Sequence, residues 1–147
     1  MTIDGVQQII MVDDSDEDHE ALARALRQVA PHCTLKRFEG SRDLFEHSLS
    51  STVPLIVLLD LNLPEENGIR VLHRLRSHTT WRVVPVVIYS GSKRPQDVAA
   101  AYAGGAAGYF LKCFDPSELL PQVGALWTWW AETVQSPRAF NFTTPES

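Results

Sequence analysis

The feature that most constrains the fold is the apolar run at residues 54–60, Pro-Leu-Ile-Val-Leu-Leu-Asp. Its apolar side chains are consecutive rather than alternating, which is typical of a strand covered on both faces in the middle of a parallel sheet. Shorter apolar runs predict further strands at residues 8–12, 34–38, 83–89 and 107–111.

Amphipathic stretches lie between these runs. In residues 16–29, apolar side chains recur every three or four positions, which is the spacing of one helix face. Further helices are expected at residues 41–49, 69–75, 95–104 and from residue 115 or 117 onward, and a loop at residues 61–67. Strands that alternate with helices predict an α/β fold, with βα repeated five times and helices on both faces of a parallel sheet.

Length and composition predict one soluble domain, residues 5–131, followed by an extended tail at 132–147. The net charge of −5 argues against nucleic acid as a partner. The two cysteines, Cys33 and Cys113, form neither a disulfide framework nor a zinc-binding spacing. With no signal peptide and no apolar stretch of about 20 residues, no membrane contact is expected and the predicted location is cytoplasmic.

Polar side chains follow four of the predicted strands directly. Asp13 and Asp14 follow the first, Asp60 the third, Ser90 the fourth and Lys112 the fifth. Functional groups of open α/β sheets collect at the carboxyl ends of the strands, so these side chains are expected to converge. Each has an ordinary explanation on its own, as a turn, a helix cap or a solvated side chain. Their joint occurrence at strand ends favours a functional site.

The chemistry of this set suits phosphoryl transfer. Clustered carboxylates repel one another and need a cation, and hard oxygen ligands favour Mg²⁺. Asp60 is the candidate nucleophile, and Lys112 supplies a second positive charge to the phosphoryl oxygens. Ser90 offers a hydrogen bond, and Asn62 offers its backbone carbonyl to the metal.

Four stretches together resemble one family: Ile-Met-Val-Asp-Asp at 10–14, Leu-Leu-Asp-Leu-Asn-Leu-Pro at 58–64, Val-Ile-Tyr-Ser-Gly-Ser at 87–92 and Gly-Ala-Ala-Gly-Tyr-Phe-Leu-Lys at 105–112. Over about residues 5–130, the chain resembles the bacterial response-regulator receiver domains, the CheY-like family. The resemblance implies a flavodoxin-like, doubly wound sheet of strand order 2-1-3-4-5. It also implies phosphoryl transfer from a kinase histidine to Asp60, with Mg²⁺ contacting Asp14 directly and Asp13 largely through water.

The resemblance further assigns Ser90 and Tyr109 to the family's switch positions, although an ordinary half-buried strand tyrosine remains the alternative for Tyr109. The chain departs from the family at Cys113, where proline usually follows the lysine. A cis bond before a residue other than proline costs about 3 kcal/mol, so a trans bond is expected there, with Cys113 as a packing residue.

Several details resemble a subgroup of the family. The acidic run at 14–19, the loop at 63–68 and the Gly-Ser after Ser90 look like the stand-alone regulators paired with bacterial phytochrome histidine kinases. This similarity implies a bacteriophytochrome as the partner kinase and no output domain.

The last predicted helix is rich in tryptophan. Four residues follow helical spacing and are expected to pack on the sheet: Leu119, Val123, Leu126 and Trp130. The aromatic residues left over are interface candidates: Trp127, Trp129, Phe140 and Phe142. They suggest a homodimer through the face of the fourth helix, fifth strand and fifth helix, together with the tail. The alternative is that the tail folds back over them within one chain.

Rival functions fit less well. A phosphatase of the haloacid-dehalogenase type needs a second acid two residues after the nucleophile, where this chain has Asn62. A degenerate receiver that serves only as an interaction module is disfavoured by the intact set of acids, serine and lysine. A phospho-acceptor switch rather than an enzyme is therefore predicted.

Overall fold

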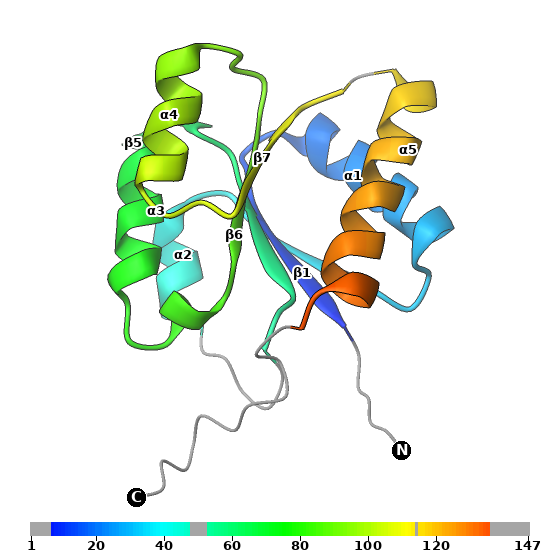
Figure 1. Ribbon diagram of the computed structural model, residues 1–147, viewed down its shortest axis with the longest axis horizontal. Helices are drawn as coiled ribbons and strands as arrows, with labels where there is room; N and C mark the ends of the chain where they lie inside the picture. Colours follow the sequence, from blue (N-terminus) through cyan, green and yellow to red (C-terminus); the bar gives the residue numbers. More distant parts are fainter. Residues whose placement is uncertain (1–6, 48–52, 114, 136–147) are drawn as a thin grey trace, which may run out of the picture.

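The computed structural model describes residues 7–47, 53–113 and 115–135. At its centre lies a five-stranded parallel sheet in the order β2-β1-β3-β6-β7 (Figure 1). The strands are β1 Gln8–Val12, β2 Thr34–Phe38, β3 Ile56–Leu59, β6 Val86–Ser90 and β7 Gly108–Leu111. Counted along the chain, this is the order second, first, third, fourth and fifth, so the predicted doubly wound fold is confirmed.

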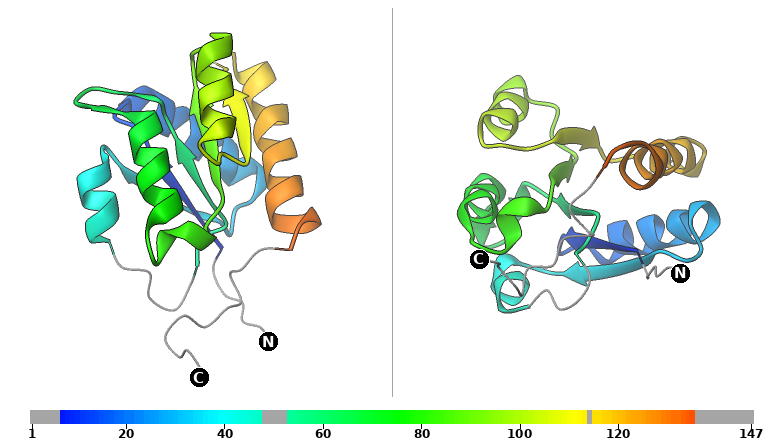
Figure 2. Two further views of the ribbon diagram at one scale, coloured as in Figure 1. Left: turned by 60° about the vertical axis from the view of Figure 1, so that its left-hand side comes forward. Right: turned by 60° about the horizontal axis from the view of Figure 1, so that its bottom comes forward.

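Helices cover both faces of the sheet, as Figures 1 and 2 show. Helices α1 (Asp16–Val29) and α5 (Pro116–Trp127) cover one face. Helices α2 (Ser41–Glu46), α3 (Gly68–Ser77) and α4 (Pro95–Ala103) cover the other. None of the helices in the described residues is both long and apolar enough to cross a membrane.

The central strand β3 is buried on both sides, as its continuous apolar sequence predicts. Val57 and Leu59 face the core under α2, α3 and α4, whereas Ile56 and Leu58 face the core under α1 and α5. All four residues are at most 2 % exposed. The apolar run stops at the strand's carboxyl end, where Asp60 follows as the first polar side chain.

The loop expected at residues 61–67 contains a short hairpin, so that prediction is wrong in detail. Strands β4 (Asn62–Leu63) and β5 (Glu66–Asn67) pair antiparallel directly before α3. The Glu66 carboxylate accepts a hydrogen bond from the Ser41 backbone N–H (2.7 Å) and another from its hydroxyl, which ties the hairpin to the start of α2. Two-residue strands give no period that a sequence pattern can reveal.

Gly68 begins α3 at a close approach to the chain that carries Asp60. A Cβ atom at Gly68 would lie 2.5 Å from the Leu61 Cα and 2.7 Å from the Asp60 carbonyl oxygen. Both atoms belong to the backbone and cannot rotate away, so only glycine fits here without moving the segment after β3.

After α5 the chain continues as a π-helical segment, η2 (Thr128–Thr133). Trp130 packs against the core under α1 and α5, as expected, and Trp127 is also half-buried against it. Trp129 is 53 % exposed. Phe140 and Phe142 lie outside the described residues, as does most of the tail predicted at 132–147, so that boundary stays a prediction.

Candidate functional site

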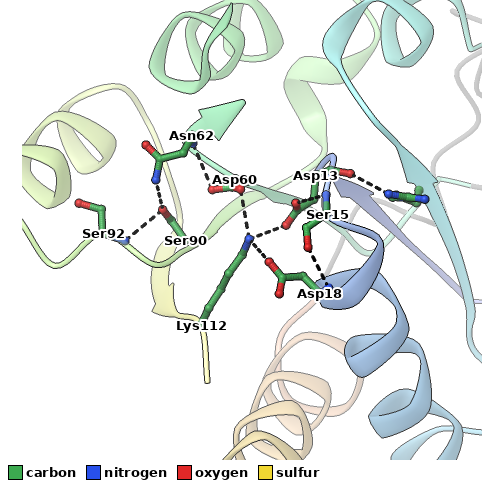
Figure 3. A network of polar contacts seen from close by, with 9 residues as sticks. Asp13, Ser15, Asp18, Asp60, Asn62, Ser90, Ser92 and Lys112 are labelled. Atoms are coloured by element: carbon green, nitrogen blue, oxygen red, sulfur yellow. Dashed lines mark hydrogen bonds and ion pairs between the residues drawn. The ribbon is translucent and has the colours of Figure 1, made fainter. Parts of the chain in front are cut away.

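The carboxyl ends of the parallel strands bring the predicted side chains to one edge of the sheet (Figure 3). Asp13 follows β1, Asp60 follows β3, Ser90 is the last residue of β6 and Lys112 follows β7. Backbone hydrogen bonds extend beyond the strands, from the Asp60 N–H to the Val12 carbonyl (3.0 Å) and from the Lys112 N–H to the Ser90 carbonyl (2.9 Å). The sheet itself therefore fixes the relative positions of these residues.

Lys112 lies at the centre of the site. Its Nζ atom lies 2.7 Å from Asp13 Oδ2, 3.1 Å from Asp60 Oδ2 and 2.6 Å from Asp18 Oδ2. The lysine side chain is only 7 % exposed, so these ion pairs are largely shielded from water. Burial alone would lower the pKa of Lys112, but hydrogen bonds to Asp13 and Asp18 and the nearby charges outweigh it, so that the pKa is raised. Lys112 is therefore a permanent positive charge at neutral pH.

Asp18 was not among the residues that the sequence analysis selected. It lies in the first turn of α1, three residues after the capping Ser15, whose hydroxyl accepts a hydrogen bond from the Asp18 N–H (3.1 Å). Helical side chains point back toward the helix N-terminus, so an acid in the first turn after β1 reaches the edge of the sheet. The direction of helical side chains is thus the feature that could have identified Asp18 from the sequence. Otherwise the run of acids in which it lies looks like a solvated helix start.

Three carboxylates form a cluster suited to a cation. Asp13, Asp14 and Asp60 each offer an oxygen atom within 4.8 Å of the others. Asp13 and Asp60 are buried and Asp14 is exposed. The buried Asp13 Oδ2 atom lies 2.7 Å from the Lys112 ammonium, and among the described residues it has no second hydrogen-bond partner. An all-oxygen set with a buried carboxylate oxygen that is paired only with the lysine fits Mg²⁺ or a similar hard cation.

Burial also affects Asp13 itself. It raises the pKa of the Asp13 carboxyl, and the charge of Asp60 acts in the same direction. Hydrogen bonds from Lys112 and from the Ser15 N–H act against this shift but do not cancel it. The folded protein therefore disfavours the ionised form of Asp13, and a bound cation would offset this penalty.

Asp60 is 5 % exposed and is held by both of its oxygen atoms. Oδ1 accepts a hydrogen bond from the Asn62 backbone N–H at 3.1 Å, and Oδ2 faces Lys112. The Asn62 side-chain amide donates to the Ser90 hydroxyl at 3.4 Å. The structure thus brings Asp13, Asp60, Ser90 and Lys112 together, while the role of the Asn62 carbonyl stays a prediction.

Ser92 connects the two predicted switch residues, a link that the sequence analysis did not include. Its backbone N–H donates to the Ser90 hydroxyl (3.3 Å), and its carbonyl accepts from the Tyr109 hydroxyl (2.9 Å). Tyr109 is half-buried and packs against the core under α4. The Ser92 hydroxyl in turn donates to Asp97 in the first turn of α4. Ser90 and Tyr109 therefore meet through one loop, between β6 and α4.

The segment after β7 agrees with expectation. No peptide bond among the described residues is cis, so the bond before Cys113 is trans. Cys113 is half-buried and packs against the core under α1 and α5.

Comparison with known proteins identifies the family. The family model described as the response regulator receiver domain matches residues 9–123. The chain belongs to this family. Membership confirms the resemblance seen in the motifs, and it agrees with the prediction of a switch protein, because receiver domains are switches rather than enzymes in the usual sense.

Individual relatives within the family are similar to this chain over part of their length. Response regulator Rcp1 of Synechocystis sp. is 33 % identical over 90 residues, which are 61 % of each chain. The nitrate/nitrite response regulator NarL of Escherichia coli is 33 % identical over 107 residues, 71 % of this chain and 49 % of NarL. The matches thus span about three fifths of Rcp1 and about half of NarL.

Solved structures of related regulators show the same fold over nearly their whole length. The phosphorylated cyanobacterial phytochrome response regulator RcpA superimposes with a TM-score of 0.81 at 25 % identity, over 90 % of this chain and 99 % of RcpA. The Mn²⁺-bound form of Rcp1 gives 0.77 at 26 % identity, over 89 % and 99 % of the two chains.

Proposed function

We propose that this receiver domain accepts a phosphoryl group on Asp60 from a phosphohistidine of a sensor histidine kinase and then signals through protein–protein contacts. The observation that carries the proposal is the position of Asp60. It is a buried carboxylate that follows the central strand, beside the Lys112 ammonium and within the carboxylate cluster of Asp13 and Asp14. A nucleophile beside a fixed positive charge and a cluster that can hold a cation suits in-line phosphoryl transfer.

In the transfer, an Asp60 carboxylate oxygen attacks phosphorus while the bond between phosphorus and the donor histidine nitrogen breaks. The histidine nitrogen leaves with the bonding electron pair, and Asp60 becomes an acyl phosphate. Lys112 donates a hydrogen bond to a phosphoryl oxygen, and the Asn62 N–H keeps the Asp60 carboxylate oriented through its other oxygen. Asp13, Asp14, Asp60 and the Asn62 carbonyl are the proposed Mg²⁺ ligands. When bound, the cation neutralises charge on the phosphoryl oxygens.

Ser90 and Tyr109 are the proposed switch. Within the described part of the chain, two contacts, at 3.3 and 3.4 Å, hold the Ser90 hydroxyl, so it can turn toward a phosphoryl oxygen at little cost. Because Ser92 donates to Ser90 and accepts from Tyr109, a movement of Ser90 is transmitted to the tyrosine through the loop before α4. The signal then leaves through the face formed by α4, β7 and α5.

A bacteriophytochrome is the proposed kinase. The support is the similarity to Rcp1 and to RcpA, the latter described as a phytochrome response regulator. A cytoplasmic location, where sensor kinases transfer phosphate to their regulators, is proposed on the same basis.

The chain is also proposed to form a homodimer through the face formed by α4, β7 and α5, extended by Trp129 and the tail. Trp129 is a large aromatic residue that is 53 % exposed, and aromatic residues are enriched at interface cores. Sedimentation of the wild type is expected to give a dimer and that of Trp129→Ala a lighter species. Equal masses would count against this contact.

The proposed reaction is tested by incubating the protein with a small phosphodonor and Mg²⁺ and measuring the intact mass. The wild type is expected to gain one phosphate, and Asp60→Asn none. Omission of Mg²⁺ should reduce the yield strongly. An equal adduct on Asp60→Asn would refute the assignment, and steady turnover of a phosphomonoester without an adduct would indicate a phosphatase instead.

A further inference from the structure

The Asp18 carboxylate is the part of the Lys112 environment that the proposed phosphoryl transfer leaves without a role. At 2.6 Å, its contact with Lys112 Nζ is shorter than those of Asp13 and Asp60. Figure 3 shows the Asp18 side chain reaching from α1 toward the lysine. Asp18 does not belong to the group of carboxylates whose oxygens lie within 4.8 Å of one another. Of the three acids that contact Lys112, it is therefore the one that is not a candidate metal ligand.

The other two partners of Lys112 have competing uses. The ammonium group has three N–H donors and faces three carboxylates, of which Asp13 and Asp60 also belong to the cation cluster. A divalent cation and the lysine therefore compete for the same two carboxylates and repel each other. A cation therefore binds more readily when another carboxylate forms an ion pair with the lysine.

The structure fixes Asp18 in a position where it forms an ion pair with the Lys112 ammonium. The Asp18 N–H donates to the Ser15 hydroxyl (3.1 Å), and the Ser15 N–H donates to Asp13 Oδ1 (2.9 Å). These bonds set the start of α1 relative to Asp13. The Asp18 side chain is only 16 % exposed, so its attraction to the lysine is less screened than that of a surface pair.

We propose that Asp18 is a positioning residue that holds the Lys112 ammonium and so leaves the Asp13 and Asp60 carboxylates available to a divalent cation. The inference rests on the proposed function, because it assigns the Asp13, Asp14 and Asp60 cluster to Mg²⁺. Without the Asp18 charge, Lys112 is drawn more strongly to Asp13 and Asp60, and the site also loses one negative charge that attracts the cation. Both changes weaken Mg²⁺ binding.

The simpler role of Asp18 is structural. An acid in the first turn of a helix stabilises that helix through its dipole, and Asp18 also takes part in the cap through its N–H. Glu17 separates the two roles, because it is an exposed acid in the same turn of α1. Glu17→Gln removes the same charge from the same helix end without touching the lysine, so it is the matched control for Asp18→Asn.

The test is a calorimetric titration of the unphosphorylated chain with Mg²⁺. Asp18→Asn is expected to raise the Mg²⁺ dissociation constant about three- to tenfold, the effect of losing one partly shielded charge interaction. Glu17→Gln should change it much less, and Asp18→Glu, which keeps the carboxylate, should lie closer to the wild type than Asp18→Asn. Thermal unfolding with and without Mg²⁺ provides a second readout. The stabilisation by Mg²⁺ should shrink in Asp18→Asn alone, whatever its stability without the cation.

Phosphorylation separates a binding defect from a general one. In Asp18→Asn, the Mg²⁺ concentration for half-maximal phosphorylation by a small phosphodonor should rise, while the rate at saturating Mg²⁺ stays near that of the wild type. Equal Mg²⁺ affinities of Asp18→Asn and Glu17→Gln would overturn the inference. So would a rate that is reduced by one factor at every Mg²⁺ concentration.

The wild type distinguishes this failure from failure of the proposed function. If the wild type binds Mg²⁺ and gains phosphate on Asp60 while Asp18→Asn binds Mg²⁺ normally, the role of Asp18 alone is wrong. If the wild type itself binds no Mg²⁺ or gains no phosphate, the proposed function falls, and the role of Asp18 with it.

Discussion

The site has two halves that differ in how firmly their side chains are held. The charged half consists of Asp13, Asp18, Asp60 and Lys112, whose ion pairs measure 2.6 to 3.1 Å. The neutral half consists of Asn62, Ser90, Ser92 and Tyr109. Among the described residues, its Ser90 hydroxyl is held by contacts of 3.3 and 3.4 Å, whereas its Tyr109 hydroxyl makes a bond of 2.9 Å. Short charge-assisted contacts fix geometry, whereas long neutral ones yield easily. The charged half is thus suited to holding ligands, and the Ser90 hydroxyl of the neutral half to rearranging when they arrive.

The largest effect is expected from removing the centre of the charged half. Lys112→Met leaves buried carboxylates without their cation and should lower the free energy of unfolding by about 3 kcal/mol in the absence of Mg²⁺. Added Mg²⁺ should recover part of this loss, because it supplies positive charge to the Asp13 and Asp60 carboxylates. Urea unfolding with and without Mg²⁺ measures both values. A loss that is the same with and without the cation would contradict the shared use of these carboxylates.

The same variant gives a pH dependence with a definite sign. The pKa of Lys112 is raised in the folded state, so its stabilisation is complete below its ordinary value of 10.5 and is lost as the pH rises above that value. Burial raises the pKa of Tyr89 to about 12. The stabilisation of the fold that comes from its neutral form is therefore also lost as the pH rises above 10, the ordinary pKa of tyrosine. The difference in unfolding free energy between the wild type and Lys112→Met should therefore shrink above pH 10.5. A constant difference would indicate that the lysine charge contributes nothing.

A smaller effect, shared by both halves, is expected at Gly68. Gly68→Ala forces the backbone at Asp60 and Leu61 to move and should cost about 1–3 kcal/mol of stability, as overpacking does. Because Asp60 moves with it, the rate of phosphorylation should fall as well. Gly124→Ala in α5 is the control, since a Cβ there meets no atom within 4 Å, and it should be neutral or stabilising. Equal stabilities and phosphorylation rates of the two variants would show that the close approach at Gly68 does not require glycine.

The smallest effect is expected in the neutral half. Tyr109→Phe removes the hydrogen bond to the Ser92 carbonyl and should cost about 1 kcal/mol of unfolding free energy. Mg²⁺ affinity should not change, because no charge is altered. Tyr102→Phe, at an exposed tyrosine on α4, is the control and should have no effect. A shift in Mg²⁺ affinity on Tyr109→Phe would show that the two halves are not separate.

The sequence predicted those parts of the molecule that depend on long apolar periods. Strands β1 and β2 and helix α1 have the predicted bounds, because a buried strand or an amphipathic helix repeats its signal over several residues. The acids, Ser90 and Lys112 could be selected because parallel strands end at one edge.

The rest depends on three-dimensional contacts that leave no periodic signal. Asp18 lies within a run of acids that is equally expected of a solvated helix start, and only the direction of its side chain brings it to Lys112. Ser92 acts largely through its backbone, which any residue has. The β4–β5 hairpin is too short to be recognised, and the need for glycine at residue 68 arises from the return of the chain toward Asp60.

The central claim is that Asp60 receives the phosphoryl group, and the most direct measurement is to locate the phosphate. The chain is phosphorylated with a small phosphodonor and Mg²⁺, the acyl phosphate is trapped by reduction, and the modified residue is identified by peptide mass spectrometry. The account predicts modification at Asp60 alone, lost in Asp60→Asn while Asp18→Asn still carries it at saturating Mg²⁺. Modification at Asp13, Asp14 or a histidine, or no modification of the wild type, would contradict it.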